Sequence, residues 1–246
     1  METLPTITWN GYEPTINAGP VTLRRIQPPD LPVYQRLFND TVTMKYDQDG
    51  PRDIKKQFEE WCQRWQPDPC GQPDPCGQPD PCGQPDPCGQ PDPCGQPDLF
   101  SALAVVHNEE KEVIGHAIVD HGDYENAYAG YSKMAIVIDP SCWGKGIGSA
   151  VVRAMVVYAR EVMDRYHRVP VDVKQEQQVQ DGIRVHRNKD SSIAWAYVPF
   201  IELRATVHKA NERACKMAET LAEEFDPIKS PCPNDPDRDL YMLPLL

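Results

Sequence analysis

The stretch Ile136–Arg160, IVIDPSCWGKGIGSAVVRAMVVYAR, decides how the rest of the sequence is interpreted. An apolar run ends in an Asp-Pro pair, three glycines then occupy every second position, and an amphipathic segment follows. This pattern predicts a strand, a tight loop and a helix from about Ile147 to Met163. Glycine is costly to order, so its repetition indicates that a ligand approaches the backbone closely at Gly144, Gly146 and Gly148. A helix N-terminus directly behind such a loop is a ready site for an anion.

Two familiar phosphate-binding loops do not fit this spacing. A P-loop requires G-x-x-x-x-G-K-[ST], whereas GKGIGS places its lysine before the second glycine and has no hydroxyl after a Gly-Lys pair. A dinucleotide fingerprint requires G-x-G-x-x-G within a βαβ unit, whereas here three consecutive strands are expected to precede the loop. A turn with a purely structural role stays open as an alternative.

The segments around the loop predict one mixed α/β domain. The expected order is strand, two helices, three antiparallel strands, helix, strand, helix and strand. This order is typical of helices packed on one central, mostly antiparallel sheet. We expect strands within residues 21–27, 99–107, 112–122, 127–139, 200–208 and 239–246, and helices from about residue 30, within 51–65 and within 210–225.

Three segments fall outside this pattern. Residues 1–19 are expected to extend a domain that spans residues 20–246. Residues 164–198 are polar, with a turn or hairpin around Asp181, and are expected to form an insertion. Residues 66–98 repeat QPDPCG five times and end in QPD. Proline at two of every six positions excludes a helix or an interior strand there.

We expect this repeat to be a surface loop, because the entropy of closing a loop grows only slowly with its length. Two alternatives stay open: a ribbon that binds soft metals or reacts as a thiol, and a docking element for a partner. Metal sites usually place cysteines two to four residues apart, whereas the cysteines of this tract recur every six residues.

Composition narrows the functional classes. The chain carries 25 basic and 37 acidic side chains, a net charge of -12, which argues against a nucleic-acid partner. No apolar run approaches the roughly 20 residues of a membrane helix, and the first residues lack the features of a signal peptide. The cysteines outside the repeat are scattered, so no disulfide framework is expected. We expect a soluble, cytoplasmic protein without a membrane partner.

Three motifs, taken in order, resemble the GNAT superfamily of acyl-CoA-dependent N-acyltransferases. WGKGIG (Trp143–Gly148) stands in the register of the signature Q/R-x-x-G-x-G/A, with the tryptophan that is also seen in the ribosomal-protein N-acetyltransferase branch. ATVHKANERACKMAETLAEEF is similar to the block V…N-x-x-A/S…GF, and VTLRRIQPPDLPVYQRLF is similar to the opening strand and helix. The resemblance implies a single GNAT-like domain whose sheet is splayed at the cofactor site and flanked by helices.

The resemblance also implies acetyl-CoA as the co-substrate, without a metal. Backbone N–H groups of the loop would hold the pyrophosphate, and the helix dipole would add to the attraction. The strand before the loop would pair with the pantetheine arm, which the amide of Asn211 would meet from the other side. Lys145 either reaches a phosphate or stays solvated. The implied cofactor residues are Ile136, Val137, Ile138, Gly144, Lys145, Gly146, Ile147, Gly148, Ser149 and Asn211.

The catalytic residues are where the resemblance is weakest. The family often carries a glutamate early on the strand before the loop, and a tyrosine or serine on the last helix. Lys133, Ala214 and Ala218 occupy the matching positions. Tyr131 and Asp120 are the candidate catalytic residues, although both also fit solvent-facing strand ends, and catalysis by positioning alone stays open. The nearby titratable residues are Asp120, His121, Tyr128 and Tyr131.

The function expected from these features is N-acetyl transfer from acetyl-CoA to a primary amine by direct attack. The acceptor would be a protein N-terminus, a lysine or a small-molecule amine. The alternative is a catalytically impaired protein that binds acyl-CoA as a sensor or scaffold, because Lys133 and Ala218 depart from the family pattern. The sequence specifies neither the acceptor nor the oligomeric state.

Overall fold

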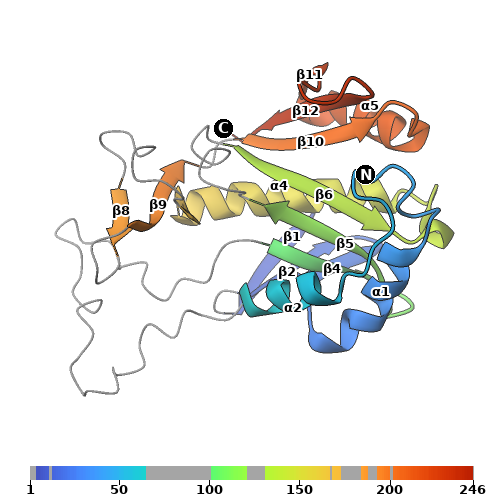
Figure 1. Ribbon diagram of the computed structural model, residues 1–246, viewed down its shortest axis with the longest axis horizontal. Helices are drawn as coiled ribbons and strands as arrows, with labels where there is room; N and C mark the ends of the chain where they lie inside the picture. The colour runs from blue at the N-terminus through green and yellow to red at the C-terminus, as the bar shows by residue number, and fades with distance from the viewer. Residues whose placement is uncertain are drawn as a thin grey trace.

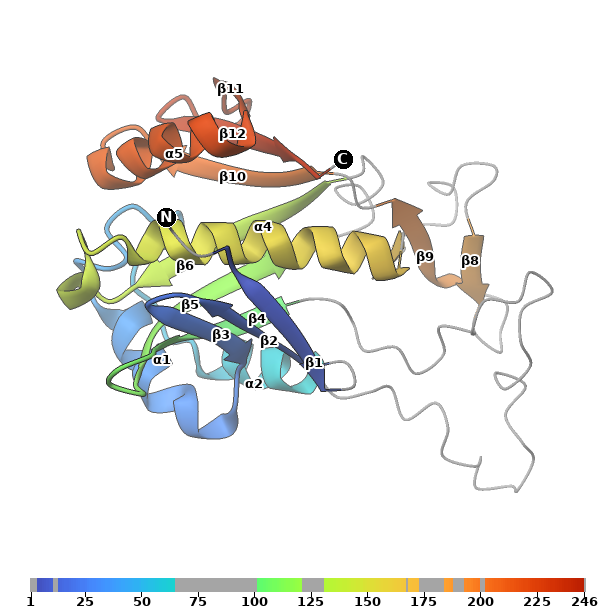
Figure 2. The ribbon, with the colours of Figure 1, turned by 180° about the vertical axis from the view of Figure 1, so that it is seen from behind.

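The computed structural model describes residues 4–10, 13–64, 101–120, 131–166, 168–172, 184–187, 193–199 and 202–245. Its centre is a nine-stranded sheet of order β1-β2-β3-β4-β5-β6-β10-β12-β11 (Figure 1). A smaller sheet of order β7-β9-β8 lies beyond the C-terminal end of helix α4 (Figure 2). The repeat at residues 66–98 falls outside the described residues.

All neighbouring strands of the large sheet are antiparallel except β6 and β10. Its strands are β1 (Thr6–Asn10), β2 (Glu13–Ala18), β3 (Val21–Arg25), β4 (Ser101–His107), β5 (Val113–Asp120), β6 (Tyr131–Ile138), β10 (Glu202–His208), β11 (Ile228–Pro231) and β12 (Arg238–Pro244). The small sheet holds β7 (Arg168–Asp172), β8 (Arg184–Arg187) and β9 (Ile193–Pro199). The helices are α1 (Leu31–Asn39), α2 (Lys55–Arg64), α4 (Ile147–Tyr166) and α5 (Glu212–Phe225), with short 3-10 turns at Pro28–Asp30 and Pro140–Cys142.

The predicted fold class is confirmed, and the differences lie in elements that the sequence does not reveal. Strands β1 and β2 fall within the stretch expected to be an extension, and both join the large sheet. Strand β2, EPTINA, alternates exposed and buried residues although it contains a proline. Strands β7, β8 and β9 fall where the sequence shows no clear element. Helix α4 runs three residues beyond its predicted end, to Tyr166.

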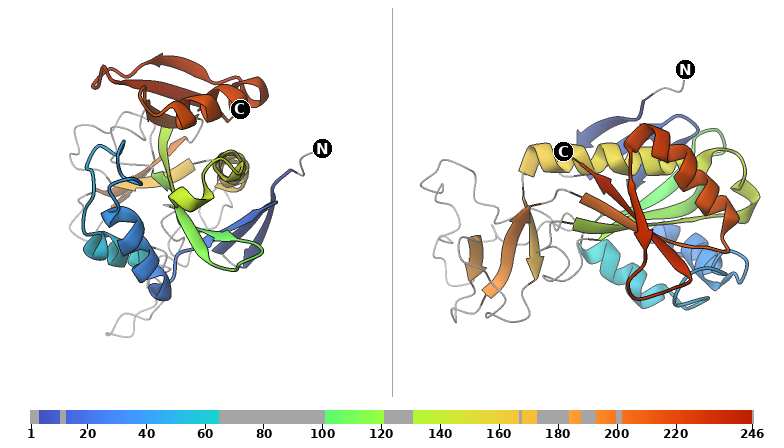
Figure 3. Two further views of the ribbon diagram at one scale, coloured as in Figure 1. Left: turned by 90° about the vertical axis from the view of Figure 1, so that its right-hand side faces the viewer. Right: turned by 90° about the horizontal axis from the view of Figure 1, so that it is seen from above.

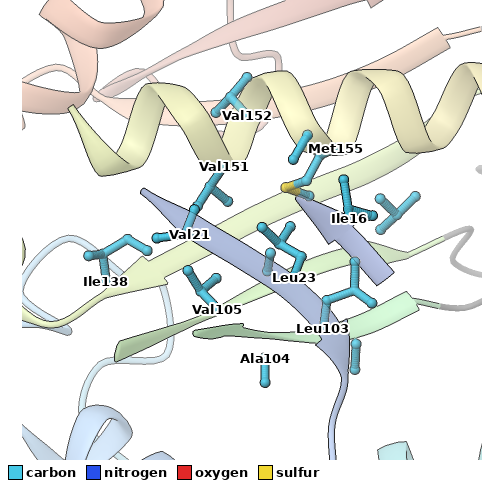
Figure 4. Close-up of a cluster of buried hydrophobic side chains, with 14 of the residues drawn as sticks. Ile16, Val21, Leu23, Leu103, Ala104, Val105, Ile138, Val151, Val152 and Met155 are labelled. Atoms are coloured by element: carbon cyan, nitrogen blue, oxygen red, sulfur yellow. The ribbon is translucent and has the colours of Figure 1, made fainter. Parts of the chain in front are cut away.

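The helices cover the large sheet in two layers. Helices α4 and α5 lie on one face, and α1 and α2 lie on the other (Figure 3). Side chains of β3 and β4, such as Leu23 and Val105, point toward Val151 and Met155 of α4 (Figure 4). All four side chains are fully buried. This contact fixes the position of the helix that follows the glycine loop. No helix of the described residues is long and apolar enough to span a membrane.

A cluster of aromatic rings attaches α1 and α2 to the opposite face. The imidazole of His116, in the middle of β5, stacks on the ring of Trp61 at 4.6 Å, and its Nδ1 lies 3.2 Å from the hydroxyl oxygen of Tyr34. Tyr34 also meets the ring of Phe58 edge-on at 4.9 Å. Complete burial, with a smaller effect from the positive charge of Arg52, lowers the pKa of His116 to about 3. His116 is therefore a neutral core residue at physiological pH.

Candidate active site

Strands β6 and β10 pair at one end and separate at the other, and we call the V-shaped region between their backbones the wedge. They are the one parallel pair among the described strands, and their register covers only Tyr131–Lys133 opposite Glu202–Arg204. Beyond this point β6 continues to Ile138 and β10 to His208. The two strands diverge toward their C-terminal ends (Figure 1). The wedge is therefore closed at Lys133 and Arg204 and opens toward the glycine loop.

One edge of β6 faces this wedge with main-chain groups that β10 does not pair. The other edge pairs with β5 along its length, and the N–H of Asp139 donates to the carbonyl of Ile114 at 2.8 Å. Main-chain groups of successive residues point to opposite edges of a strand. Those of Ile136 and Ile138 therefore point into the wedge. Those of Val137 point into the β5 ladder, so its main chain is engaged on the side away from the wedge.

Trp143 closes the wide end of the wedge on the β6 side. Its indole Nε1–H donates to the carbonyl oxygen of Ile138 at 2.8 Å. An indole has a single donor, so this bond occupies the only polar group of the side chain. The carbonyl of Ile136 also points into the wedge, beyond the residues of β6 that β10 pairs.

The three glycines of the loop differ in their structural roles. Gly144 and Gly146 have φ angles of +74° and +77°, and a Cβ atom at either position would have no heavy atom within 4 Å. Backbone conformation, not packing, therefore favours glycine at both positions. The alternation of left-handed and ordinary residues turns successive N–H groups toward a common point, as in anion-binding nests. At Gly148, by contrast, a Cβ atom would lie 2.9 Å from Sδ of Met217 on α5.

The N-terminus of α4 lies directly behind this loop. The first bond of the helix runs from the N–H of Ala150 to the carbonyl of Gly146 at 3.1 Å. The N–H groups of Ile147, Gly148 and Ser149 precede it and have no partner within the helix. Together with the helix dipole, they form a site suited to a pyrophosphate. Lys145, exposed in the loop, adds a positive charge beside them.

The loop is held in place by Asp139. Its carboxylate accepts hydrogen bonds from the N–H and the hydroxyl of Ser141, at 2.9 and 2.7 Å, and forms an ion pair with Arg36 of α1. Burial raises the pKa of Asp139, but the hydrogen bonds from Ser141 and Arg36 outweigh it, so the pKa lies below its usual value. The carboxylate therefore stays charged and attaches the loop to α1.

Helix α5 provides the opposite side of the wide end. Oδ1 of Asn211 accepts a hydrogen bond from the N–H of Ala214 at 3.2 Å, which makes Asn211 the N-cap of α5. In the first turn, the guanidinium carbon of Arg213 lies 5.0 Å from the ring centre of Trp143. The first turn of α5 therefore meets the glycine loop. Sequence reasoning missed Arg213, although a cation in the first turn of a helix, where the dipole disfavours it, was a signal.

The loop between α1 and α2 reaches across to the strands beyond the wedge. A guanidinium N–H of Arg238 on β12 donates to the carbonyl oxygen of Tyr46. The ring of Tyr46 lies 5.3 Å from that of His208, the last residue of β10. This loop therefore connects the layer of α1 and α2 to the far side of the wedge.

The predicted catalytic residues, Tyr131 and Asp120, belong to strands that meet at the closed end of the wedge. In the backbone register, Tyr131 lies opposite Glu202 and Asp120 lies opposite Lys133. The side chains of both candidates lie outside the described part of the chain, as do His121 and Tyr128 entirely. Lys133 is exposed, and the carboxylate of Glu202 pairs with Arg204. Among the described residues, no group of three or more His, Cys, Asp or Glu side chains is placed to hold a metal ion.

Comparisons with known proteins agree with this fold. The chain resembles the solved N-acetyltransferase of Staphylococcus aureus Mu50 (TM-score 0.52, 15% identity, 93% of this chain and 100% of that one) and the GNAT-family acetyltransferase of Bacillus anthracis (TM-score 0.51, 13% identity, 94% and 98%). It also resembles the spermidine N-acetyltransferase of Vibrio cholerae, solved with CoA and spermine (TM-score 0.51, 13% identity, 91% and 94%). These likenesses show the fold.

No curated protein matches the sequence. The model of the acetyltransferase (GNAT) family matches residues 56–182, which is more than half of the chain. The chain therefore belongs to the GNAT acetyltransferase family.

Proposed function

We propose that the protein transfers an acetyl group from acetyl-CoA to a primary amine. The observation that carries this proposal is the wedge between β6 and β10, which opens onto the glycine loop. The pantetheine arm is an extended chain with two amides, about as long as four residues of strand. With the pyrophosphate at the glycine loop, the thioester would lie near the closed end of the wedge.

Each part of the wedge has a role in this arrangement. The first-turn N–H groups of α4 and the loop hold the pyrophosphate, and Lys145 balances part of its charge. The wedge-facing N–H and carbonyl of Ile136 pair with an amide of the arm. The indole of Trp143 keeps the Ile138 carbonyl paired at the wide end.

The proposed reaction is direct attack. The amine nitrogen attacks the carbonyl carbon of the thioester, the carbon–sulfur bond breaks, and coenzyme A leaves as a thiolate that takes up a proton. A main-chain N–H of β6 near the closed end polarises the carbonyl oxygen. Asp120 is proposed to accept the proton of the amine, and Tyr131 to protonate the thiolate, because both strands meet at this end.

A second function is favoured by the residues at two family positions. Lys133 is exposed at the closed end, and α5 carries Ala218 where a tyrosine or serine is usual. A chain without a working base and acid would bind acetyl-CoA without turnover and act as a sensor or scaffold.

An acceptor panel with acetyl-CoA separates these functions. Because a similar structure contains spermine, the panel includes polyamines, beside lysine peptides, peptides with free N-termini and ribosomal proteins. Release of the coenzyme A thiol and the thermal shift are followed together. We expect turnover with one acceptor class, and a loss of about 10²-fold or more in kcat for D120N or Y131F with the acetyl-CoA Kd unchanged.

Three results would contradict parts of this proposal. A thermal shift without turnover on any acceptor would favour the sensor. Full activity in both variants would remove Asp120 and Tyr131 from the mechanism and leave catalysis by positioning. No binding of acetyl-CoA would overturn the proposed function.

A further inference from the structure

The first position of the glycine motif has no polar group left for an anion. The family pattern places glutamine or arginine there, whereas this chain has Trp143. The single donor of the indole is already bonded to the Ile138 carbonyl at 2.8 Å. Any side-chain cation for the phosphates beyond Lys145 must therefore come from another element.

Arg213 is placed to supply that cation. Its guanidinium lies over the face of the Trp143 ring, which holds it beside the glycine loop. The side chain is exposed, and within the described residues it belongs to no ion pair. Its five N–H donors match the oxygens of a phosphate.

Arg213 lies at a helix end that suits an anion better than a cation. A cation in the first turn of a helix opposes the helix dipole. Lys216, one turn further along α5, adds like charge, which Glu212 in the first turn offsets in part. An anion held between the loop and α5 would relieve both effects, because it would lie close to the N-termini of α4 and α5 together.

The overall charge of the chain favours a cation at the site. A net charge of -12 repels an anionic cofactor, so binding depends on positive groups concentrated at the site. Lys145 provides one from the loop and Arg213 a second from α5. We propose that Arg213, held on the ring of Trp143, binds a phosphate group of acetyl-CoA. This inference rests on the proposed function and names a binding residue of the same site.

The test compares the affinity of acetyl-CoA for the wild-type protein, R213A and R213Q by isothermal titration calorimetry. K55A is the matched control, because Lys55 is an exposed lysine of α2, on the opposite face of the sheet. We expect the Kd to rise about tenfold in both Arg213 variants and to stay unchanged in K55A. The dependence of log Kd on log salt should also become shallower without Arg213. Equal melting temperatures show that the variants fold.

Cofactor fragments distinguish direct binding from an effect on packing. Pantetheine lacks all phosphates, so its affinity should be the same in the wild type and in R213A. Dephospho-CoA identifies the phosphate: an effect that persists places Arg213 at the pyrophosphate, and one that disappears places it at the 3′-phosphate. A twofold or smaller change with acetyl-CoA, or an equal loss with pantetheine, would overturn the inference alone. A wild-type protein that does not bind acetyl-CoA would overturn the proposed function with it.

Discussion

At the scale of single residues, three glycines with the same spacing serve two purposes. Gly144 and Gly146 have positive φ angles and open space around them, whereas at Gly148 a Cβ atom would lie 2.9 Å from Sδ of Met217. A regular sequence pattern therefore combines two glycines that shape a binding loop with one that lets α5 approach α4.

Alanine at Gly146 and at Gly148 should separate these purposes. A left-handed conformation costs alanine about 1–2 kcal/mol, so G146A should lower the free energy of unfolding by that amount and weaken acetyl-CoA binding. G148A should change the stability by less than about 1 kcal/mol, because the end of a flexible methionine can move. Urea denaturation and calorimetric titration measure both quantities. Equal losses in the two variants would contradict the distinction.

The buried imidazole of His116 predicts a pH dependence of stability. Its pKa is about 3 in the folded chain, against an unperturbed value of 6.5, so below pH 6.5 the unfolded state binds more protons than the native state. The free energy of unfolding should therefore decrease as the pH is lowered, by about 2 kcal/mol from pH 8 to pH 5 from this group alone. H116Q should reduce the fall by that amount in urea denaturation at the two pH values. Identical falls would show that His116 contributes nothing.

At the scale of elements, Asn211 has two roles: it caps helix α5, and it is predicted to bind the cofactor. Its Oδ1 caps α5, while its amide nitrogen is the group predicted to meet the pantetheine arm. N211A should cost about 1 kcal/mol of stability and weaken acetyl-CoA binding. N211D is the matched variant, because aspartate caps a helix as well as asparagine but has no amide donor.

N211D should therefore keep the melting temperature of the wild type and bind acetyl-CoA more weakly. Thermal denaturation and calorimetric titration of the two variants test this expectation. Wild-type affinity in N211D would limit Asn211 to capping.

Some of the elements could be predicted from the sequence alone, and others could not. The start of α4 at Ile147 was predicted because glycine and an Asp-Pro pair are strong local signals. Strands β1 and β2 were not predicted, because their stability depends on pairing with β3 and not on their own composition. The edge of β6 to which the Val137 main chain points could be known only from the register of β6 with β5. The contact of Arg213 with Trp143 required the packing of α5, which no local pattern encodes.

At the scale of the molecule, the residues that flank the repeat and the small sheet lie at the same end of the large sheet. Helix α2 ends and β4 begins at the end of the sheet away from the glycine loop, where α4 also ends and the small sheet lies (Figure 1). The wide end of the wedge is formed by other segments, namely the glycine loop and the first turn of α5. Changes in the repeat should therefore leave the cofactor site intact.

Shortening the repeat tests this separation. Residues 72–89 are three of the five copies and half of the connection between Arg64 and Ser101. Their deletion should raise the free energy of unfolding by about 0.6 kcal/mol, because halving a loop reduces its closure entropy by that amount. The acetyl-CoA Kd should not change. Urea denaturation and calorimetric titration measure the two quantities.

A control of equal length separates the effect of length from that of composition. Replacing residues 72–89 by 18 glycines and serines keeps the length and removes the cysteines and prolines. If the tract is only a loop, this variant should match the wild type in stability, affinity and turnover. If its thiols bind soft metals, cadmium binding should be lost in the replacement and in the deletion alike. Loss of turnover in both variants, with acetyl-CoA still bound, would instead assign the tract to the acceptor, because the closed end of the wedge faces the same side of the molecule.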